Sequence, residues 1–347
     1  MGNRSICIVT GAAGFLGSTL TGMLLSDGFR VRALVHNQKN VANVPAGAEV
    51  FVGDVRDPAS LEALFAAPSD RSSVPAPSLP SEDDSSFLFF HAAAHLSVAK
   101  KDPECYEATV TGTKNVIAAC RAHGAKLIYF GSVDALDNPG DGAPIAEPER
   151  FDLPHPHSDY ERSKADAGNL VLDAAAEGLD ACVILPSCLM GPGDRKGGFV
   201  TFMLRSYLKF RPRVSFRGGY DFADVRDAAR GAICAAGRLV RGEIFILSGE
   251  SVTVTELFNL INEEKGWKPI RTTLPTGLLY VAAPFINLAN RLRGKRKIVT
   301  GNSLRLLRLG ASFSHEKAAE ELGYRPRPFK ETLSDTLKDL EPQKEAR

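Results

Sequence analysis

A glycine-rich turn lies between the first apolar run of this chain and its first segment of helical periodicity. Residues 6–10 are strand-like, residues 16–25 have helical spacing, and Gly11, Gly14 and Gly17 lie at the junction. Glycines permit a sharp turn and let the helix pack close to the strand. Unpaired N–H groups at the start of the helix can then bind phosphates. The Gly-x-x-Gly-x-x-Gly spacing differs from Gly-x-Gly-x-x-Gly, but its strand-to-helix context favours a dinucleotide site over an ordinary turn.

The alternation of strand and helix continues through the N-terminal half. Further strands are predicted at residues 30–35, 50–52, 87–90, 126–129 and 181–185, and helices at residues 60–66, 105–123 and 160–176. Short apolar strands separated by helices are typical of a parallel sheet covered on both faces. The predicted fold class is α/β, a Rossmann-type doubly wound parallel sheet with a smaller C-terminal substrate-binding part.

The alternation becomes irregular after about residue 190. We expect a dinucleotide-binding Rossmann domain at residues 1–190 and a mainly substrate-binding part at residues 191–347, with residues 220–250 returning to the sheet. The C-terminal part is predicted to contain a turn at residues 191–195, a strand or loop leading into a helix at 222–237, a strand at 244–247 and a helix at 254–265 that Thr253 or Thr255 caps. Segments of this kind commonly cover the carboxyl end of a parallel sheet, where ligands bind. Residues 68–86, rich in Pro and Ser, predict a flexible surface insertion.

Composition excludes several classes of protein. The 347 residues carry a formal net charge of +1, which argues against a nucleic-acid-binding protein because such a protein needs a basic face. No apolar run reaches the roughly 18 residues of a membrane span. The nearest candidate, residues 278–292, contains Pro284 and is followed by basic residues up to 297. We expect an amphipathic helix packed on the protein, while peripheral membrane contact by residues 278–297 stays open.

The cysteines and the N-terminus indicate a cytoplasmic protein. None of the six cysteines forms a C-x-x-C pair, which favours buried, reduced thiols over disulfides or metal ligands. Residues 1–5 run directly into a strand with no apolar signal region, so we expect no signal peptide. We predict no metal site, and we expect the binding partner to be a small molecule. A homodimer stays an open possibility.

Tyr160 and Lys164 lie four residues apart at the predicted start of a helix, so they share one helix face. A free tyrosine has a pKa of about 10, and a nearby ammonium favours the phenolate. Such a pair can donate a proton to a carbonyl oxygen or take one from an alcohol. Ser132 follows a predicted strand, where its hydroxyl can stabilise charge on the substrate oxygen. Without the glycine motif upstream, Tyr-x-x-x-Lys would be an ordinary helical surface pattern, and Ser132 an ordinary turn residue.

The segment after the second predicted strand bears on cofactor choice. A site for NAD usually has an acidic residue about 20 residues after the glycine motif, bonded to the ribose hydroxyl. No acidic residue lies between Asp27 and Glu49, whereas Arg32, His36 and Lys39 are basic. NADP(H) is therefore favoured, with NAD(H) still open, because these bases suit a 2′-phosphate unless they are ordinary surface charges.

A series of motifs in one order makes the chain resemble a known family. They are TGAAGFLG at residues 10–17, GDVRD at 53–57, HAAA at 91–94, GTKNVIAAC at 112–120, Ser132, YERSK at 160–164, LPSCLMGPGD at 185–194, YDFADVRDAARG at 220–231 and ELGYRPRP at 321–328. The chain resembles an extended short-chain dehydrogenase/reductase of the NAD-dependent epimerase/dehydratase superfamily. Within it, the dihydroflavonol 4-reductase and 3-beta-hydroxysteroid dehydrogenase branches are most similar.

The resemblance implies roles for residues at matching positions. The implied catalytic residues are Ser132, Tyr160 and Lys164, and the last two would also bind the cofactor. The other implied cofactor-binding residues are Gly11, Gly14, Phe15, Leu16, Gly17, His36 at the 2′-phosphate, Asp54 and Val55 at the adenine, Ala92, Ala93 and Ala94 along the path, and Pro186, Ser187, Cys188 and Leu189 beside the nicotinamide. One departure is Thr109, where many members have an Asn that supports a proton relay.

These observations favour an NAD(P)-dependent oxidoreductase that transfers a hydride between a cofactor and a ketone or alcohol carbon. One alternative is a nucleotide-sugar epimerase or dehydratase that uses the same side chains. A second is a non-catalytic NAD(P)-binding regulator, which would be expected to lack Tyr160 or Lys164. The sequence does not indicate the substrate, because the pocket comes mostly from the irregular C-terminal segments.

Overall fold

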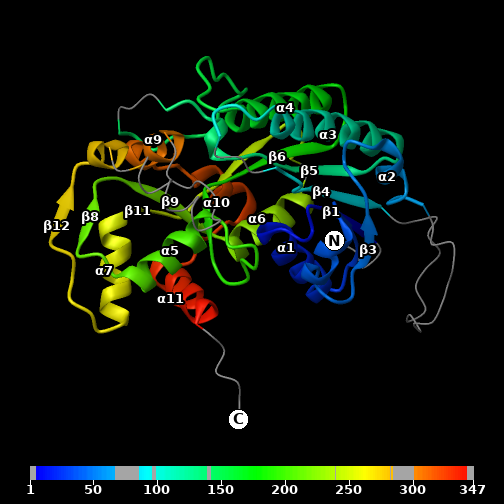
Figure 1. The fold of residues 1–347 in the computed structure, drawn as a ribbon. Coiled ribbons are helices and arrows are strands. Elements are labelled where there is room, and N and C mark those ends of the chain that lie inside the picture. The colour runs from blue at the N-terminus through cyan, green and yellow to red at the C-terminus, as the bar shows by residue number, and fades with distance from the viewer. Residues whose placement is uncertain are drawn as a thin grey trace, which may run out of the picture.

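A computed structural model gives the fold of the chain (Figure 1). It describes residues 5–66, 86–95, 99–138, 142–238, 240–281, 283 and 301–341, without the side chains of residues 302 and 303. Except for Ser86, the insertion predicted at residues 68–86 lies outside the described residues. The same holds for most of the segment 278–297, including its basic residues.

A seven-stranded sheet forms the centre of the fold. Its order is β10-β6-β5-β4-β1-β2-β3, and every neighbouring pair is parallel. The strands are β1 (Ile6–Thr10), β2 (Arg30–Val35), β3 (Glu49–Val52), β4 (Phe87–His91), β5 (Lys126–Phe130), β6 (Ala181–Pro186) and β10 (Ile244–Leu247). The order reverses direction beside β1, as in a doubly wound Rossmann sheet, which confirms the predicted fold class. At that reversal the carboxyl ends of parallel strands form a crevice.

Helices cover both faces of this sheet (Figure 1). One face packs against α2 (Pro58–Glu62), α3 (Pro103–Ala122) and α4 (Asp159–Ala176), and the other against α1 (Phe15–Ser26), α6 (Val225–Ala236) and α10 (Glu316–Leu322). Successive strand residues face opposite sides, so β5 buries Leu127 and Tyr129 in one layer and Ile128 and Phe130 in the other. This burial explains the continuous apolar runs in the sequence.

Helix α2 differs from its prediction at residues 60–66. It begins at Pro58 and ends at Glu62. Asp57 caps its N-terminus through the backbone N–H groups of Ala59 and Ser60, and proline suits the first helical position. The cap therefore starts the helix two residues earlier than apolar spacing alone suggests.

The C-terminal half adds two small sheets and several helices. The three-stranded sheet has the order β11-β9-β7 and the two-stranded sheet pairs β12 with β8. Their strands are β7 (Cys188–Met190), β8 (Val214–Phe216), β9 (Gly219–Asp224), β11 (Glu250–Thr253) and β12 (Thr272–Leu274); the helices are α5 (Phe199–Phe210), α7 (Val254–Glu264), α9 (Gly301–Leu309) and α11 (Phe329–Leu340). Thr253 caps α7 in a capping box with Glu256, one of the two predicted caps. The boundary expected near residue 190 stays a prediction, although β10 is a strand of the large sheet and α6 packs against it.

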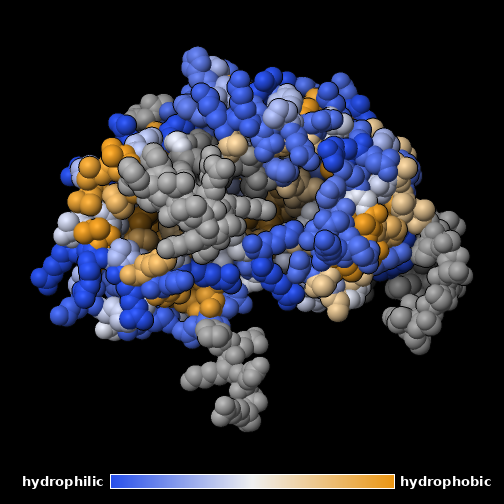
Figure 2. Space-filling model, viewed as in Figure 1, coloured by the Kyte–Doolittle hydropathy of each residue, from blue (hydrophilic) through white to orange (hydrophobic). Residues whose placement is uncertain are grey.

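Apolar side chains gather on one end of the surface, near β12 and α9 (Figure 2). Leu278, Tyr280 and Val281 are 49%, 44% and 68% exposed, and Leu309 on α9 is 39% exposed. The start of the segment 278–292, which was predicted to pack on the protein, is therefore exposed among the described residues. Within the described ranges, no helix has the length and apolar character needed to cross a membrane.

All six cysteines lie in described residues and are free thiols. Cys7, Cys105, Cys120 and Cys182 are buried, as predicted. Cys7, Cys120 and Cys182 lie inside the apolar layers as small hydrophobic side chains, Cys105 donates to the His95 carbonyl, and Cys188 and Cys234 are only partly buried. Among the residues that the structure describes, no cluster of three or more His, Cys, Asp or Glu is arranged to hold a metal ion.

Candidate active site

The glycine turn lies at the carboxyl end of β1, against the end of β4. Gly11 has φ +69°, and a Cβ on it would lie 2.7 Å from the Ala92 carbonyl oxygen. A Cβ on Gly17 would overlap the Gly11 carbonyl. Helix α1 begins at Phe15, followed by Leu16, and its N-cap residue Gly14 has no side chain to bond the first backbone N–H groups. The backbone amides at this helix start are thus available to an anionic ligand, so the turn fits the pyrophosphate of a dinucleotide.

A buried histidine fixes the strand end beside this turn. Thr113 Oγ1 donates to the Thr109 carbonyl at 2.7 Å, so it accepts from His91 Nε2 at 3.2 Å. His91 Nδ1 then accepts from Thr10 Oγ1 at 2.8 Å, and that hydroxyl accepts the Ala93 N–H at 3.2 Å. Burial lowers the pKa of His91 to about 3, so the imidazole stays neutral. The sequence analysis quoted His91 only as part of the HAAA motif and gave it no role, although it positions the predicted path Ala92, Ala93 and Ala94.

Tyr160, Lys164 and Ser132 meet at the carboxyl end of β5. Ser158 caps α4, which carries Tyr160 and Lys164 one turn apart. The buried Lys164 Nζ donates to the Phe130 carbonyl at 2.7 Å. Tyr160 is part-exposed, and Ser132 lies close enough to oppose the rise in its pKa. The predicted catalytic residues are therefore neighbours, although they come from two separate segments.

The electrostatics differ from those expected for Tyr160. Burial raises the pKa of Tyr160, and the Asp134 carboxylate raises it further. Burial also lowers the pKa of Lys164 to about 8, so its ammonium group loses the proton more readily than that of a free lysine. The expected lowering of the tyrosine pKa by the ammonium is therefore absent in this unliganded state. The raised pKa keeps the Tyr160 phenol protonated near neutral pH.

A charged group next to these residues was missed by the sequence analysis. Asp134 lies in the 3-10 helix η3 (Val133–Ala135), whose N-cap is Ser132. The neighbouring Glu161 is 2% exposed and accepts from Arg305 of α9 at 2.6 Å. Tyr220 of β9 and Cys188 of β7 also lie close enough for the Asp134 charge to raise their pKa values. The position of Asp134, two residues after the predicted catalytic Ser132, was a signal that could have identified it. Nothing in the sequence pointed to Arg305.

The far end of the predicted cofactor site contains both signs of charge. His36 is 68% exposed at the end of β2, with Nδ1 3.5 Å from Asp54 Oδ2. Arg56 bonds the same carboxylate and holds the pKa of Asp54 below its usual range. Asn37 and Lys39 are exposed beside His36, Lys39 in the 3-10 helix η1 (Gln38–Asn43). Asp54 is thus an acidic neighbour of His36 that the sequence window between Asp27 and Glu49 does not include.

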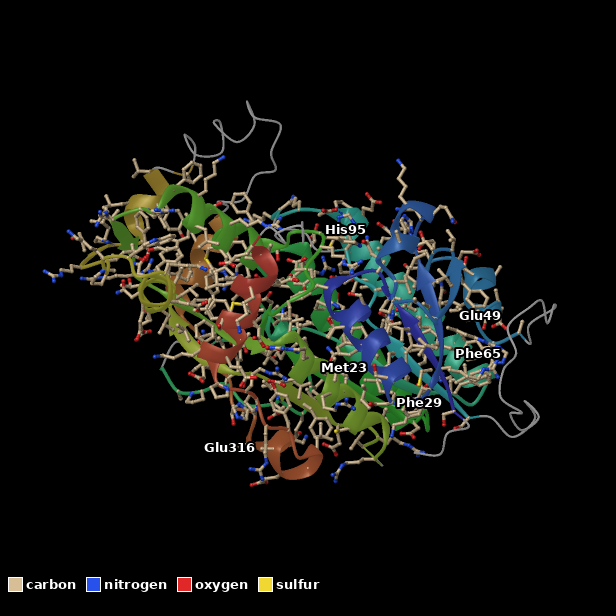
Figure 3. All side chains as sticks on the ribbon, turned by 90° about the horizontal axis from the view of Figure 1, so that it is seen from below. Met23, Phe29, Glu49, Phe65, His95 and Glu316 are labelled. Carbon is tan, nitrogen blue, oxygen red and sulfur yellow. The ribbon has the colours of Figure 1, made fainter. Side chains whose placement is uncertain are left out.

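Arg32 does not belong to this group of bases. Its side chain is 2% exposed, donates to the Leu64 carbonyl at 2.8 Å, and pairs with Glu49 at 3.2 Å. Figure 3 shows Glu49 and Phe65 at the edge of the sheet that β3 forms. Because Arg32 lies in the amino-terminal half of β2, its charge is used inside the fold and is not available at the carboxyl end.

The remaining predicted cofactor residues also lie along this crevice. Val55 follows β3 and packs closely enough on α3 that a Cβ on Gly112 would lie 2.6 Å from its Cγ2. Pro186 ends β6, the buried Ser187 donates its N–H to Leu247, and Cys188 and Leu189 begin β7. Thr109, in place of the expected relay Asn, has a buried hydroxyl with no hydrogen-bond partner within the described part of the chain.

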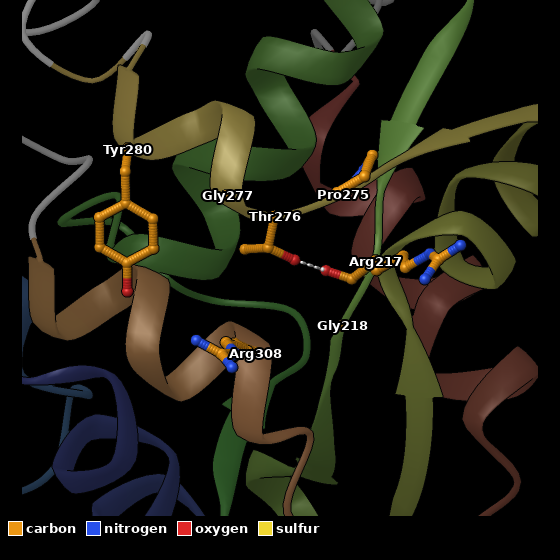
Figure 4. Close-up of a pocket in the computed structure, with 7 residues that line it drawn as sticks. All are labelled: Arg217, Gly218, Pro275, Thr276, Gly277, Tyr280 and Arg308. Carbon is orange, nitrogen blue, oxygen red and sulfur yellow. Dashed lines mark hydrogen bonds between the residues drawn. The ribbon is translucent and has the colours of Figure 1, made fainter.

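A cavity of about 460 Å³ lies in the C-terminal half (Figure 4). Its lining residues are Arg217, Gly218, Pro275, Thr276, Gly277, Tyr280 and Arg308. Thr276 Oγ1 donates to the Arg217 carbonyl at 2.6 Å, which holds the two walls together. Arg308 lies three residues after Arg305 on α9. One helix therefore borders the cavity and also contacts Glu161, the residue that follows Tyr160.

Comparisons with known proteins agree with this architecture. Residues 82–247 match the model of the NAD dependent epimerase/dehydratase family, and residues 3–69 match that of the NmrA-like family. A putative dihydroflavonol 4-reductase of Synechocystis sp. is 28% identical, covering 95% of this chain and 92% of that one. A 4-hydroxy-2-methyl-3-oxo-4-farnesyl-3,4-dihydroquinoline-1-oxide ketoreductase of Stigmatella aurantiaca is also 28% identical, covering 96% of each chain.

The crystal structure of gox2253 is similar over the whole fold. It is 30% identical and covers 97% of each chain, with a TM-score of 0.77. The family match spans the predicted catalytic segments, and the relatives align from one end of the chain to the other. The chain belongs to the NAD-dependent epimerase/dehydratase family of extended short-chain dehydrogenases/reductases.

Proposed function

We propose that this protein reduces a carbonyl group on a bulky, largely apolar small molecule, with a nicotinamide dinucleotide as the hydride donor. The convergence of Tyr160, Ser132 and Lys164 at the crevice beside the glycine turn carries this proposal. The names of the two relatives, a dihydroflavonol reductase and a ketoreductase, support the direction.

The roles of the side chains follow from their chemistry. A bound nicotinamide supplies the hydride to the carbonyl carbon. Tyr160 gives its O–H proton to the carbonyl oxygen, so that C=O becomes CH–OH, and the phenolate then recovers a proton from solvent. Ser132 donates a hydrogen bond to the same oxygen while negative charge develops there. Lys164, fixed by the Phe130 carbonyl, would stabilise the phenolate and would help to hold the nicotinamide ribose when the cofactor is bound.

We propose NADP(H) as the cofactor, although fewer basic side chains support this choice than the sequence suggested. His36 and Lys39 stay exposed at the end of β2, whereas Arg32 is buried. Arg56 offsets the charge of Asp54, so the two exposed bases still favour a 2′-phosphate, which carries about two negative charges.

The cavity supports a bulky substrate. At about 460 Å³ it falls within the range of small-molecule sites, roughly 300–1,000 Å³. Its lining residue Arg308 lies on α9, the helix whose Arg305 bonds Glu161.

The test compares the wild type with Tyr160→Phe on a panel of ketones, followed by NADPH absorbance. We expect kcat to fall by about 10²–10⁴-fold, because general acid catalysis is lost, while cofactor affinity measured by fluorescence stays the same. Tyr106→Phe is the matched control, since the Tyr106 hydroxyl bonds Asp166 on the outer side of α3 and α4. A Tyr160→Phe enzyme with wild-type kcat would remove this residue from the mechanism.

A sugar-nucleotide epimerase or dehydratase is the second candidate. The observation that favours it is Asp54, because a carboxylate 3.5 Å from His36 suits the ribose hydroxyls of NAD. Such an enzyme would be purified with tightly bound NAD and would convert UDP-sugars without net consumption of NADH. Purified protein free of NAD and inactive on UDP-sugars decides for the reductase.

A further inference from the structure

We propose that the cavity between the chain after β12 and helix α9 binds the carboxylate of a largely apolar acid, with the Arg308 guanidinium as its main ligand. The substrate of the proposed reductase would then be a carboxylic acid. That second statement rests on the proposed function, whereas the binding site itself does not.

The cavity is a built feature of the C-terminal part, because specific contacts hold its walls. Gly218 has φ +112°, and a Cβ on it would overlap the Leu307 carbonyl oxygen, so α9 packs directly on the chain before β9. Thr276 Oγ1 donates to the Arg217 carbonyl at 2.6 Å and joins the chain after β12 to the same segment. A ligand would therefore meet walls that are already in place.

Two polar side chains of this cavity are free to bind a ligand. Figure 4 shows the Tyr280 hydroxyl and the Arg308 guanidinium facing the same space, while the Arg217 side chain extends away from it. Within the described part of the chain, neither group has a hydrogen bond or an ion pair. Arg305, three residues earlier on α9, is by contrast paired with Glu161 at 2.6 Å. Arg308 is thus a cation that the fold leaves for a ligand.

The chemistry of the lining fits a carboxylate attached to a carbon skeleton. A guanidinium offers two parallel N–H donors that match the two oxygens of one carboxylate. The Tyr280 hydroxyl adds another donor, whereas Gly218, Pro275 and Gly277 add no charge and suit apolar groups. A nucleoside diphosphate carries more negative charge than one guanidinium balances, so a carboxylate is the better match.

Two elements lead from the cavity toward the predicted catalytic residues. Along β9, Phe222 lies four residues after Gly218, which is roughly 13 Å of extended chain, and it pairs with Cys188, a residue predicted to lie beside the nicotinamide. Along α9, Arg308 lies one helical turn after the arginine that bonds Glu161. An elongated molecule with its carbonyl group about that far from its carboxylate would reach both places.

The first experiment measures the binding of decanoate and of 1-decanol to the full chain by calorimetry at neutral pH. We expect the wild type to bind decanoate more tightly than 1-decanol. Arg308→Met should weaken decanoate binding by about tenfold, the low end for a hydrogen bond to a charged group because Arg308 is exposed, and should affect 1-decanol much less.

Three further variants sharpen this measurement. Arg308→Lys should recover only part of the decanoate affinity, since an ammonium lacks the planar pair of donors. Tyr280→Phe should weaken decanoate by a smaller factor than Arg308→Met, because it removes one neutral donor. Arg241→Met is the matched control: Arg241 is exposed, lies before β10 and does not line the cavity, so both affinities should stay the same.

The second experiment compares kcat/KM for straight-chain keto acids of increasing length with kcat/KM for their methyl esters. We expect the wild type to prefer the acid severalfold at one or more chain lengths. Arg308→Met should lose this preference through KM rather than kcat, because the carboxylate is held equally before and during the reaction. Arg241→Met should keep the preference.

Decanoate that binds no better than 1-decanol, or that loses affinity equally in Arg308→Met and Arg241→Met, overturns the binding site. UDP that binds where decanoate does not, and that depends on Arg308, overturns it too and favours the sugar-nucleotide enzyme. Equal kcat/KM for acids and esters overturns the acidic substrate alone. If the wild type reduces no carbonyl compound, the proposed function fails, and the binding data alone decide whether Arg308 holds a carboxylate.

Discussion

The crevice edge of the large sheet and the C-terminal part are held together in different ways. At the carboxyl ends of the strands, site residues contact backbone atoms: Lys164 of α4 bonds the Phe130 carbonyl, and Gly11, which follows β1, lies against the Ala92 carbonyl. In the C-terminal part, ion pairs join segments far apart in the chain. Arg305 bonds Glu161 across 144 residues, and Arg327 bonds Asp227 across 100.

The predicted catalytic residues and the C-terminal part therefore depend on different kinds of contact. Backbone contacts at strand ends have few alternatives, because the parallel sheet fixes where each strand ends. Ion pairs between side chains depend on the identity of both partners and on how far solvent reaches them. We therefore expect substitutions at the sheet edge to affect catalysis or the backbone, and substitutions of the C-terminal pairs to affect stability and substrate binding.

The largest effect is expected from Gly11→Ala. The added Cβ would lie 2.7 Å from the Ala92 carbonyl oxygen, and the residue would have to keep φ +69°. Overpacking costs about 1–3 kcal/mol and the left-handed conformation about 1–2 kcal/mol, so we expect a loss of roughly 3 kcal/mol or more in the free energy of unfolding. Urea unfolding measures this loss, together with weakened cofactor binding.

Gly124→Ala is the matched control for Gly11→Ala. Gly124 has φ +60°, and a Cβ there would meet no atom within 4 Å. It should lose only the conformational part, about 1–2 kcal/mol. Equal losses at the two glycines would show that the close approach to Ala92 does not matter.

Lys164→Met should separate activity from stability. We expect kcat/KM to fall by about 10²-fold, or roughly 2.7 kcal/mol of transition-state stabilisation, without a loss of stability near pH 7. Burial lowers the folded pKa of Lys164 from 10.5 to about 8, so the charged form costs roughly 3 kcal/mol in the folded protein. Methionine removes that cost. It also leaves the Phe130 carbonyl without its hydrogen-bond donor, which destabilises the folded protein by about 1–3 kcal/mol.

The pH dependence of stability has a definite sign for Lys164. Between pH 8 and pH 10.5 the unfolded chain binds this proton and the folded protein does not, so wild-type stability rises with pH relative to Lys164→Met. Chemical unfolding at pH 7 and pH 10 measures the difference. A difference that falls with rising pH would mean that Lys164 is stabilised as the cation in the folded protein.

Arg305→Met tests the C-terminal side of the comparison. Glu161 is 2% exposed and would be left as a buried charge without this partner. Removing one member of a buried pair costs about 3–5 kcal/mol, and because Arg305 is 26% exposed we expect about 2 kcal/mol. Arg150→Met, whose pair with Asp173 is 56% and 50% exposed, should cost less than about 1 kcal/mol. Adding Glu161→Gln to Arg305→Met should restore part of the loss, and no restoration would argue against an unpaired charge as its cause.

The smallest effect is expected at His36. A carboxylate in its place would repel a 2′-phosphate, so His36→Asp should shift the NADPH-to-NADH ratio of kcat/KM about tenfold toward NADH, or 1.4 kcal/mol. His155→Asp, an exposed histidine in the segment before α4, should leave the ratio unchanged. A wild type that prefers NADH would remove the case for a phosphate site and favour Asp54 as a ribose ligand.

The sequence predicted the large sheet well because its signals are local. Each buried parallel strand is a short apolar run, and each helix that covers it has its own periodicity, so the strands from residue 6 to residue 185 could be found one at a time. The C-terminal elements were harder to predict. Strands such as β7, β8 and β12 span three residues each, too few to show a period.

For the candidate site, the division follows the same physics. The sequence alone placed Tyr160 and Lys164 on one face at the start of a helix and Ser132 at the end of a strand, since spacing along one helix and position after one strand are properties of the local chain. Only the tertiary structure showed that Arg32 is buried, that Asp54 approaches His36, and that Arg305 reaches Glu161. Burial and charge pairing depend on which distant segments meet, and they set the pKa values of Tyr160 and Lys164 against the local expectation.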